Sequence, residues 1–410
     1  MTGLILPLED RYQDYLTDES GIMGKADTIS FPETEAHVQQ IVKTLARQKI
    51  PITVQGSRTG FSGSAVPVCG HILNLSAMKG ITGLGRDESG RFFIRVQPGL
   101  SLLNLNRQLY TRQIDLKDVS QDFFEIQAAM KKSGPQFWPP DPTESHASIG
   151  GIAATNARGI CSHGYGLTRH HIKGIRIVDA SGEVRSIDRG RFYFSGRTQI
   201  KKDLIDLYLG NNGMLGVITE LTLCLIPRPP EIWGIVFFFK DRLKAPAFAE
   251  AIGREPNTGS GARIVGIEYM NRTTLDSIGR YKKNGPPSAG LPDVDSKFSG
   301  AVYVEIHGND PGSVEALAEN ILETASGFNG DPDDTWAFSG ENEIRKPHDF
   351  CHAAAASAIF EVNTARRNDP GITRVGIEVQ CRKGGVPDVL EIFFAEHSIG
   401  RTRKILFKTK

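Results

Sequence analysis

The chain has 410 residues, and at about 150 residues per domain this length predicts two or three domains with a sizeable core. Its 48 Lys and Arg residues nearly balance 47 Asp and Glu residues, so a formal net charge of +1 argues against nucleic acid or an anionic membrane as a partner. A hydrophobic fraction of 39% and a charged fraction of 23% exclude a disordered or collagen-like chain. The 44 glycines make up about 11% of the residues, above the usual ~7%, so we expect backbone that approaches a ligand closely.

A helix and two strands are predicted first. Residues 35–49 carry apolar side chains at helical spacing, and the alternation after Pro51 predicts a strand over residues 52–54. That strand leads into a loop with three glycines, Gln55–Gly63. A second strand is expected at residues 71–75.

The next segments alternate between regular elements and a stiff loop. Residues 92–96 predict a strand, Pro98–Gly99 a turn, and Ser101 the N-cap of a helix. Residues 111–136 have poor periodicity and predict helix fragments. Three prolines within residues 137–145 exclude a helix there and predict a rigid, extended wall.

Small residues then open a helix at residues 149–157, where the backbone can approach a ligand closely. A hairpin is expected with strands at residues 175–179 and 184–187. Residues 213–220 lead into a further predicted strand, in which leucines alternate, and Arg228–Pro230 ends the domain.

A second α+β domain is predicted after this break. Apolar runs predict strands at residues 232–239, 264–270 and 301–307, and residues 313–325 predict a helix. The Gly, Pro, Ser and Asp residues between positions 279 and 299 predict a mobile loop. The predicted domains are therefore residues 1–228 and 229–410.

The cysteines and the apolar runs indicate the compartment. No C-x-x-C pair occurs among the cysteines, so neither a structural zinc site nor a disulfide framework is predicted. The longest apolar run, residues 232–239, is far shorter than the ~20 residues that cross a bilayer. The N-terminal segment has no basic region that would start an export signal, so we expect a cytoplasmic protein. The cysteines are Cys69, Cys161, Cys224, Cys351 and Cys381.

The glycine loop Gln55–Gly63 is the first candidate binding site. Its glycines and small polar residues can turn several backbone amides inward, which suits a phosphate or pyrophosphate, and Arg58 can add positive charge. The glycine spacing matches neither the P-loop nor the common dinucleotide motif. A tight turn without a ligand is the alternative for any single glycine cluster, but several such clusters argue against coincidence.

Several short motifs stand in a characteristic order along the chain. They are Phe31–Thr34 with a helix after it, Gly56–Gly63, Val96–Gly99, Pro139–Ser145, Ile149–Gly151, Ala154–Asn156 and Gly213–Glu220. In this order they resemble the FAD-binding domain of the vanillyl-alcohol oxidase/PCMH superfamily, and within it the D-lactate dehydrogenase/glycolate oxidase family. The likeness covers residues from about 15 to 230, and a weaker likeness to the cap domain of that family extends to about residue 390.

The resemblance implies an α+β fold in which two α+β subdomains clasp FAD, followed by a shortened α+β cap domain that binds the substrate. The pyrophosphate would lie on the glycine loop, and since this loop contains no histidine we expect noncovalent FAD. For Cys161 and His163, near the implied flavin, we favour a packing or polar-wall role over a covalent link. The implied FAD-binding residues are Gln55, Gly56, Ser57, Arg58, Thr59, Gly60, Phe61, Ser62, Pro98, Gly99, Pro140, Asp141, Ser145, Gly150, Gly151, Ala154, Asn156, Gly159, Cys161, Tyr165, Gly166, Gly213, Gly216, Val217 and Ile218.

The resemblance also implies hydride transfer to the flavin from a D-2-hydroxy acid, such as D-lactate or a glycolate-like acid, with the cap binding the carboxylate. Relatives end with an H-x-G-D-x-H-x-H-like motif whose histidines hold a divalent metal. This sequence has no such motif, so no metal ligand is predicted. Relatives place an arginine before a His-Ala pair, whereas here Cys351 precedes His352, which is the expected catalytic residue. Other candidates in the cap are Glu268, Glu305, His307, Arg345, His348 and Glu378.

Two alternatives remain. The chain could be an FAD-binding subunit or a degenerate enzyme that relies on a partner chain, such as an iron–sulfur or electron-transfer flavoprotein subunit, which would also accept its electrons. It could also be a truncated product, because a frame change near residue 390 would yield an unfamiliar end. Five Lys or Arg residues stand among the last ten, for which a solvated tail is favoured over a binding patch.

Overall fold

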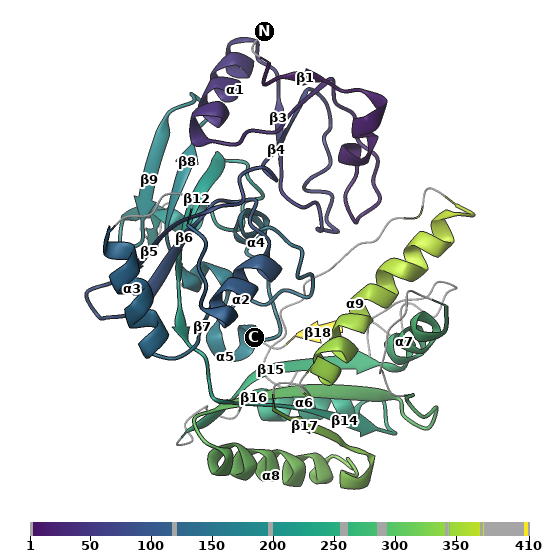
Figure 1. The fold of residues 1–410 in the computed structure, drawn as a ribbon. Coiled ribbons are helices and arrows are strands. Elements are labelled where there is room, and N and C mark those ends of the chain that lie inside the picture. Colours follow the sequence, from purple (N-terminus) through teal and green to yellow (C-terminus); the bar gives the residue numbers. More distant parts are fainter. Residues whose placement is uncertain are drawn as a thin grey trace. The chain divides into compact units, whose positions relative to one another are not determined.

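The computed structural model describes residues 3–116, 121–195, 200–254, 261–284, 293–340, 343, 345–369, 372 and 406–408. Two compact units divide this chain (Figure 1). The described residues of unit 1 fall within 3–159 and 167–228, and those of unit 2 fall within 160–166, 229–372 and 406–408. The segment Ile160–Gly166, which the sequence assigns to the first domain, therefore belongs to the second unit. Glu378, Cys381 and the basic tail, apart from residues 406–408, lie outside the described residues.

The first sheet of unit 1 is built around a short parallel segment. Its elements are β1 (Leu6–Pro7), η1 (Asp10–Leu16), β2 (Thr28–Ser30), α1 (Glu35–Arg47), β3 (Ile52–Gln55) and β4 (His71–Asn74). The strand order is β1-β2-β4-β3, and β4 pairs in parallel with both β2 and β3. The predicted helix begins at Glu35 because the Thr34 side chain accepts a hydrogen bond from the His37 amide.

The second sheet of unit 1 has five antiparallel strands in the order β5-β6-β12-β8-β9. Helices α2 and α4 are capped by Ser101 and Ser148. Apolar residues of α2, α3, α4 and this sheet form the largest core of the unit. The elements are β5 (Ile81–Arg86), β6 (Phe92–Val96), α2 (Leu102–Thr111), α3 (Gln121–Lys132), β7 (Gln136–Phe137), α4 (Ile149–Thr155), η2 (Thr168–His171), β8 (Ile172–Val178), β9 (Val184–Asp188), β10 (Phe192–Ser195), β11 (Ile200–Asp203), η3 (Leu204–Leu207), β12 (Val217–Cys224) and β13 (Ile226–Pro227).

Helix α1 joins the two sheets of unit 1. Its buried side chains pack against β4 and against Val178 and Val217 of the second sheet. The Glu35 carboxylate accepts two hydrogen bonds from Arg176, at 2.7 and 3.1 Å, and one from Thr219. This interface holds the two α+β subdomains together.

His71 makes unit 1 sensitive to acid. The side chain is fully buried on β4, with Nδ1 2.8 Å from Thr28 Oγ1, and Nε2 has no hydrogen-bond partner among the described residues. Burial lowers the pKa of His71 from 6.5 to about 4. The unfolded chain therefore binds the proton first, and the free energy of unfolding should fall by up to about 3 kcal/mol as the pH drops from about 6.5 to about 4.

Urea unfolding at several pH values in this window measures the effect, and His71→Gln serves as the comparison because an amide does not titrate. The variant should lose most of the fall in stability that the native chain shows. An equal fall in both proteins would contradict the assignment to His71.

Unit 2 is a five-stranded sheet with helices on both faces, in the order β17-β14-β16-β15-β18. Its elements are α5 (Ser162–Tyr165), β14 (Glu231–Phe239), α6 (Lys244–Gly253), β15 (Ala262–Asn271), α7 (Arg272–Asn284), β16 (Gly300–Gly308), α8 (Pro311–Gly327), η4 (Pro332–Asp334), β17 (Trp336–Ser339), α9 (Arg345–Arg366) and β18 (Leu406–Lys408). Side chains alternate along β16: Val302, Val304 and Ile306 pack with α6 and α8, while Ala301 and Tyr303 pack with α7 and α9. By the same alternation, Glu305 and His307 lie on the face of Tyr303.

The prediction of a loop over residues 279–299 is wrong at its start. Helix α7 continues to Asn284, because Leu275 and Ile278 at helical spacing are buried in the core. Residues 285–292 lie outside the described residues. Gly279 was one of the residues that favoured a loop. In the helix this position faces open space, because a Cβ atom there would have no described heavy atom within 4 Å.

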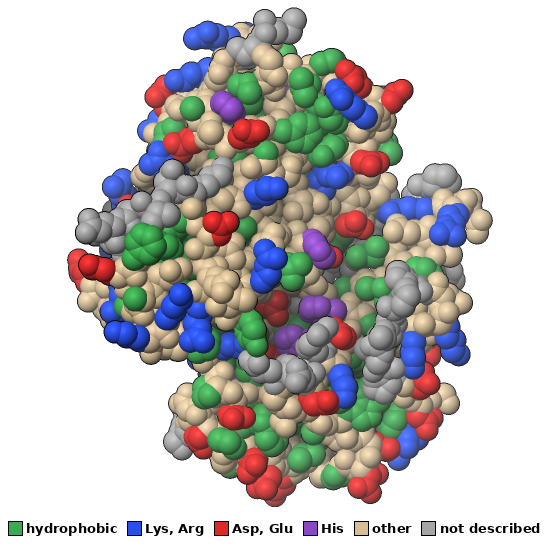
Figure 2. Space-filling model, viewed as in Figure 1, with side chains coloured by type: hydrophobic (Ala, Val, Ile, Leu, Met, Phe, Trp, Pro, Cys, Tyr) green, Lys and Arg blue, Asp and Glu red, His purple; other side chains and the backbone are tan. Residues whose placement is uncertain are grey.

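Charge is mixed over the surface, as the net charge implies. Figure 2 shows Lys and Arg together with Asp and Glu on the visible face of each unit. Among the described helices, none is both long and apolar enough to cross a membrane.

Candidate functional site

The glycine loop Gln55–Gly63 lies against the first turn of α4 in unit 1. The Ser57 amide is 3.4 Å from Ser148 Oγ, and a Cβ atom at Gly56 would overlap that hydroxyl. Around Gly60, by contrast, a Cβ atom would have no described heavy atom within 4 Å. Two motifs that are separate in sequence therefore form one surface, with open space at the middle of the loop.

Two loop residues expected to contact FAD are held by the protein itself. The side-chain amide of the buried Gln55 donates through Nε2 to the backbone carbonyls of Tyr15 and Ala65, at 2.8 and 2.7 Å, and these bonds hold the start of the loop in place. Arg58, at a φ of 61°, donates to the Asp14 carbonyl, and its guanidinium lies 4.4 Å from the centre of the Tyr15 ring. These contacts fix the shape of the loop from the side of η1.

The turn Pro98–Gly99 packs directly against α4. The Gly150 amide donates to the Pro98 carbonyl at 2.8 Å, and the Gly99 amide donates to the Met78 carbonyl at 2.7 Å. A Cβ atom on Gly150 would lie 2.5 Å from Pro98 Cβ and 3.0 Å from Pro98 O. Only glycine allows this backbone approach.

Gly150→Ala is expected to destabilise the protein by about 1–3 kcal/mol, because the methyl group must displace the Pro98 turn. Thermal unfolding followed by circular dichroism measures the loss. The matched control is Gly279→Ala in α7, where the added methyl group meets open space and should leave the melting temperature unchanged or slightly higher. Equal melting temperatures for Gly150→Ala and the native chain would show that the turn is not constrained in this way.

Some of the remaining residues assigned to FAD in unit 1 lie near the end of α4. A Cβ atom on Gly159 would overlap the backbone of Asp141, and Asn156 caps α4 at a φ of 46°. The amide of Asn212 donates to the Ala154 carbonyl at 2.8 Å, which places the glycine-rich segment before β12 beside α4. Val217 and Ile218 themselves are buried core residues of β12. Which of these residues touch FAD stays a prediction.

A second cluster lies in unit 2, on the face of β16 that bears Tyr303, Glu305 and His307. Glu305 is 2% exposed and His307 is 5% exposed. The His307 Nε2 atom is 2.8 Å from Glu305 Oε1, and Tyr303 donates its hydroxyl to Glu305 Oε2 at 2.6 Å. His348 of α9 contacts the same carboxylate, with Nε2 2.7 Å from Oε2. Because an ionised carboxylate only accepts, both imidazoles donate to it.

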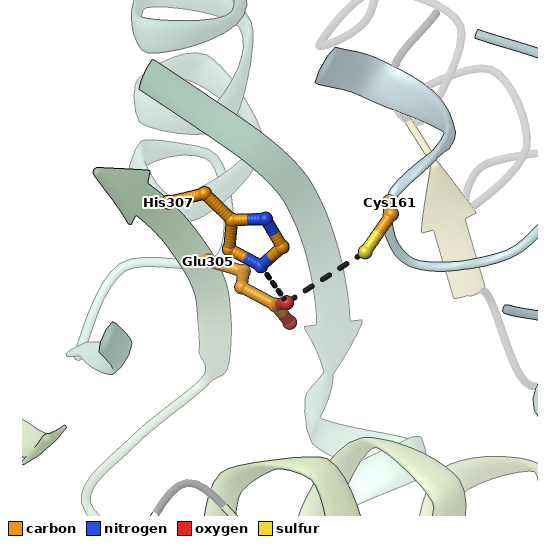
Figure 3. Close-up of side chains that lie close together, drawn as sticks. All are labelled: Cys161, Glu305 and His307. Carbon is orange, nitrogen blue, oxygen red and sulfur yellow. Dashed lines mark hydrogen bonds and ion pairs between the residues drawn. The ribbon is translucent and has the colours of Figure 1, made fainter. Parts of the chain in front are cut away.

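The segment Ile160–Gly166 brings a thiol and a phenol to this cluster. A Cβ atom on Gly164 would lie 2.6 Å from Val265 Cα, and one on Gly266 would lie 2.7 Å from Ile160 Cγ2. Because glycine has no Cβ atom, these two residues let α5 lie close against β15. Cys161 thereby reaches Glu305 Oε1 with its thiol at 3.6 Å, as Figure 3 shows. Tyr165 completes the chain of contacts, with its hydroxyl 2.8 Å from His307 Nδ1.

The charges of the cluster are set by the buried carboxylate. Burial raises the pKa of Glu305, but His348 and His307 outweigh it and hold that pKa well below its ordinary value. Burial and the adjacent carboxylate raise the pKa of Tyr303 well above its ordinary value. Burial also raises the pKa of Tyr165. A carboxylate surrounded by neutral phenols and imidazole donors is an arrangement that can hold or move protons.

The structure brings together some of the cap candidates and separates others. Glu305, His307 and His348 form the cluster, and the His352 ring lies 6.0 Å from that of His348 on α9. Glu268 is buried on β15, whereas the Arg345 side chain and Glu378 lie outside the described residues. Tyr303 and the Tyr165 contact were not predicted. The pattern Tyr-x-Glu-x-His in one strand was the signal that could have revealed the shared face.

Comparison with known proteins finds an FAD binding domain in the N-terminal half of the chain. Residues 26–120 and 122–188 match the FAD binding domain family. Over 232 residues the chain is 32% identical to a D-lactate dehydrogenase of Anaerostipes hadrus, a match that covers 56% of this chain and 43% of that protein. Over 283 residues it is 30% identical to the glycolate oxidase subunit GlcD of Escherichia coli strain K12, covering 66% of this chain and 50% of that protein.

The fold has a counterpart among solved structures. A chitooligosaccharide oxidase superposes with a TM-score of 0.55 at 14% identity, over 83% of this chain and 58% of that chain. The chain spans about half the length of the curated relatives it matches. The predicted α+β fold and the predicted cofactor, FAD, are confirmed by these matches. The chain therefore carries an FAD binding domain over residues 26–120 and 122–188, and it is similar to the D-lactate dehydrogenases and the glycolate oxidase GlcD subunits.

Proposed function

We propose that this protein is an FAD-linked oxidoreductase that oxidises a D-2-hydroxy acid of the lactate or glycolate class to the 2-oxo acid. The observation that carries the proposal is the combination, in one chain, of an FAD binding domain with a buried carboxylate that holds two histidines. Relatives named D-lactate dehydrogenase and glycolate oxidase subunit support the substrate class.

The residues of unit 1 fit a noncovalently bound dinucleotide. The loop lies against the start of α4 at Ser57, and the open space at Gly60 in the same loop leaves room for a pyrophosphate beside backbone amides. The predicted FAD-binding residues on this surface would hold the cofactor without a covalent link, because the loop offers no histidine. When bound, FAD supplies the two-electron acceptor for the hydride that leaves the α-carbon of the substrate.

Histidines of α9 would handle the proton of the substrate hydroxyl. We assign the role of general base to His352, the catalytic residue expected from the sequence, so its imidazole would accept this proton. His348 lies beside it and is held by Glu305, so it acts as a positioning residue that keeps the two rings in contact. The hydroxyl proton would thus go to the imidazole of His352, and the hydride with its electron pair would be left for the bound cofactor to accept.

The visible spectrum of the FAD-loaded chain tests the proposal. Under anaerobic conditions, one D-2-hydroxy acid from a panel of D and L isomers should bleach the flavin absorption, with formation of the matching 2-oxo acid. A flavin that stays oxidised with every acid, in a chain that retains FAD, would overturn the proposed substrate class.

A second function is favoured by one observation in α9. Cys351, which stands where relatives of the cap carry an arginine, is 2% exposed and packs in the core of unit 2. A buried thiol offers no cation for a substrate carboxylate, so the chain would act as an FAD-binding subunit that relies on a partner, and one relative is named a subunit. Copurification with an iron–sulfur or flavoprotein subunit that also takes the electrons would support this function, while full activity of the isolated chain would exclude it.

A further inference from the structure

We propose that Cys161, Glu305 and His307 bind a divalent metal ion, with Zn²⁺ as the preferred ion. This site goes beyond the proposed oxidoreductase function and does not depend on it, because metal binding can be measured without turnover. All three residues belong to unit 2 and are buried, and their ligand atoms lie within 4.8 Å of one another.

The distances suit a tetrahedral ion. Ordinary Zn–ligand bond lengths place the oxygen and nitrogen ligands about 3.3 Å apart and the oxygen and sulfur ligands about 3.6 Å apart. In the cluster, Glu305 Oε1 lies 2.8 Å from His307 Nε2 and 3.6 Å from Cys161 Sγ. Figure 3 shows both side chains pointing toward this carboxylate. An ion would therefore need the imidazole and the carboxylate to move apart by about 0.5 Å, and it would need the Cys161 and His307 ligand atoms, which lie within 4.8 Å of each other, at a spacing of about 3.6 Å.

The surrounding hydrogen bonds are those that metal ligands require. With Nε2 toward the ion, His307 can donate its Nδ1 proton to the Tyr165 hydroxyl at 2.8 Å, which fixes the ring and its tautomer. The second oxygen of Glu305 is occupied by Tyr303 and His348, at 2.6 and 2.7 Å, so Oε1 is the oxygen left for the ion.

Charge and ligand type favour zinc over the hard divalent cations. A thiolate and a carboxylate together carry two negative charges, which a divalent ion neutralises inside a buried site. A thiolate ligand disfavours Mg²⁺ and Ca²⁺, whereas mixed S, N and O ligands suit Zn²⁺. Three protein ligands leave a fourth position for water or another oxygen, as in catalytic rather than structural zinc sites.

Sequence spacing carried no sign of this site, since Cys161 and Glu305 are 144 residues apart. The expectation that the chain has no metal ligand rested on local motifs alone. The ligands come together because α5 lies against β15, and β15 pairs with β16, the strand that carries Glu305 and His307.

The test uses the full chain loaded with FAD, treated with a chelator and then supplied with Zn²⁺ or Co²⁺. After removal of loose metal, elemental analysis should find about one Zn²⁺ per chain. The Co²⁺-minus-Zn²⁺ difference spectrum, in which the flavin absorption cancels, should show a thiolate-to-cobalt charge-transfer band. A native chain that retains no stoichiometric Zn²⁺, or a cobalt form without that band, overturns the proposal without recourse to any variant.

Variants assign the ligands. Cys161→Ser should lose the charge-transfer band, while Cys69→Ser, a control at an exposed cysteine of unit 1, should keep it. Tyr165→Phe removes only the hydroxyl that orients His307 and should weaken Zn²⁺ binding by about 10–100-fold with the band retained. Binding unchanged in Tyr165→Phe, or a band that survives Cys161→Ser, would contradict the assigned ligand set.

Discussion

Gly60→Asp should abolish the retention of FAD by the purified chain. The position lies at the middle of the glycine loop, where the new side chain would enter the open space assigned to the pyrophosphate. At a separation of about 4 Å and an effective dielectric constant of about 20, repulsion between two unit charges amounts to about 4 kcal/mol, which corresponds to a loss of FAD affinity of at least about 100-fold. Fluorescence titration of the FAD-free chain measures this loss.

Gly60→Ala is the matched control for this prediction. Its methyl group meets no described heavy atom within 4 Å, so the variant should fold and keep FAD nearly as well as the native chain. If Gly60→Asp retained FAD, the phosphate site would have to lie elsewhere. If both variants lost FAD equally, the effect would come from the shape of the loop rather than from charge.

His352→Asn should lower the rate of flavin reduction by the D-2-hydroxy acid about 10²–10⁴-fold, the usual contribution of a general base. The loss should appear in kcat with little change in KM, because the imidazole is needed for the proton in the transition state. FAD retention should be unaffected, since α9 lies outside the residues that match the FAD binding domain. Anaerobic stopped-flow absorption measures the rate.

Two further histidine variants show whether the effect is specific. His348→Gln keeps a donor for Glu305 and should therefore reduce kcat less than His348→Ala, as expected for a positioning residue. His37→Asn, on α1 of unit 1, is the matched control and should leave the rate unchanged. A rate in His352→Asn equal to that of the native chain would remove this residue from the mechanism.

Local pattern was sufficient for much of the fold. The helical spacing of Val38, Ile41 and Leu45 predicted α1, and the leucine alternation after Gly216 predicted β12, because each element shows one apolar face with its own period. The ordered glycine and proline motifs predicted an FAD binding domain, which the match over residues 26–120 and 122–188 confirms. Helix α9 was not predicted from residues 345–366.

The tertiary structure decided what those motifs do. The sequence could not reveal that Gly150 is needed for contact with Pro98, since the two stand in separate motifs and meet only when α4 packs against the turn. The same holds for Cys161, whose segment leaves the first unit of the chain and joins β15 of the second.

By itself, then, the sequence determined the helices and strands with one buried face, the FAD binding domain and the set of cap candidates, because these depend on short-range periodicity and on the order of motifs. Only the tertiary structure selected Glu305, His307 and His348 from that set and added Cys161, Tyr165 and Tyr303. Contacts between residues far apart in the chain arise from the packing of whole elements, and a buried carboxylate gathers whichever donors that packing brings within reach.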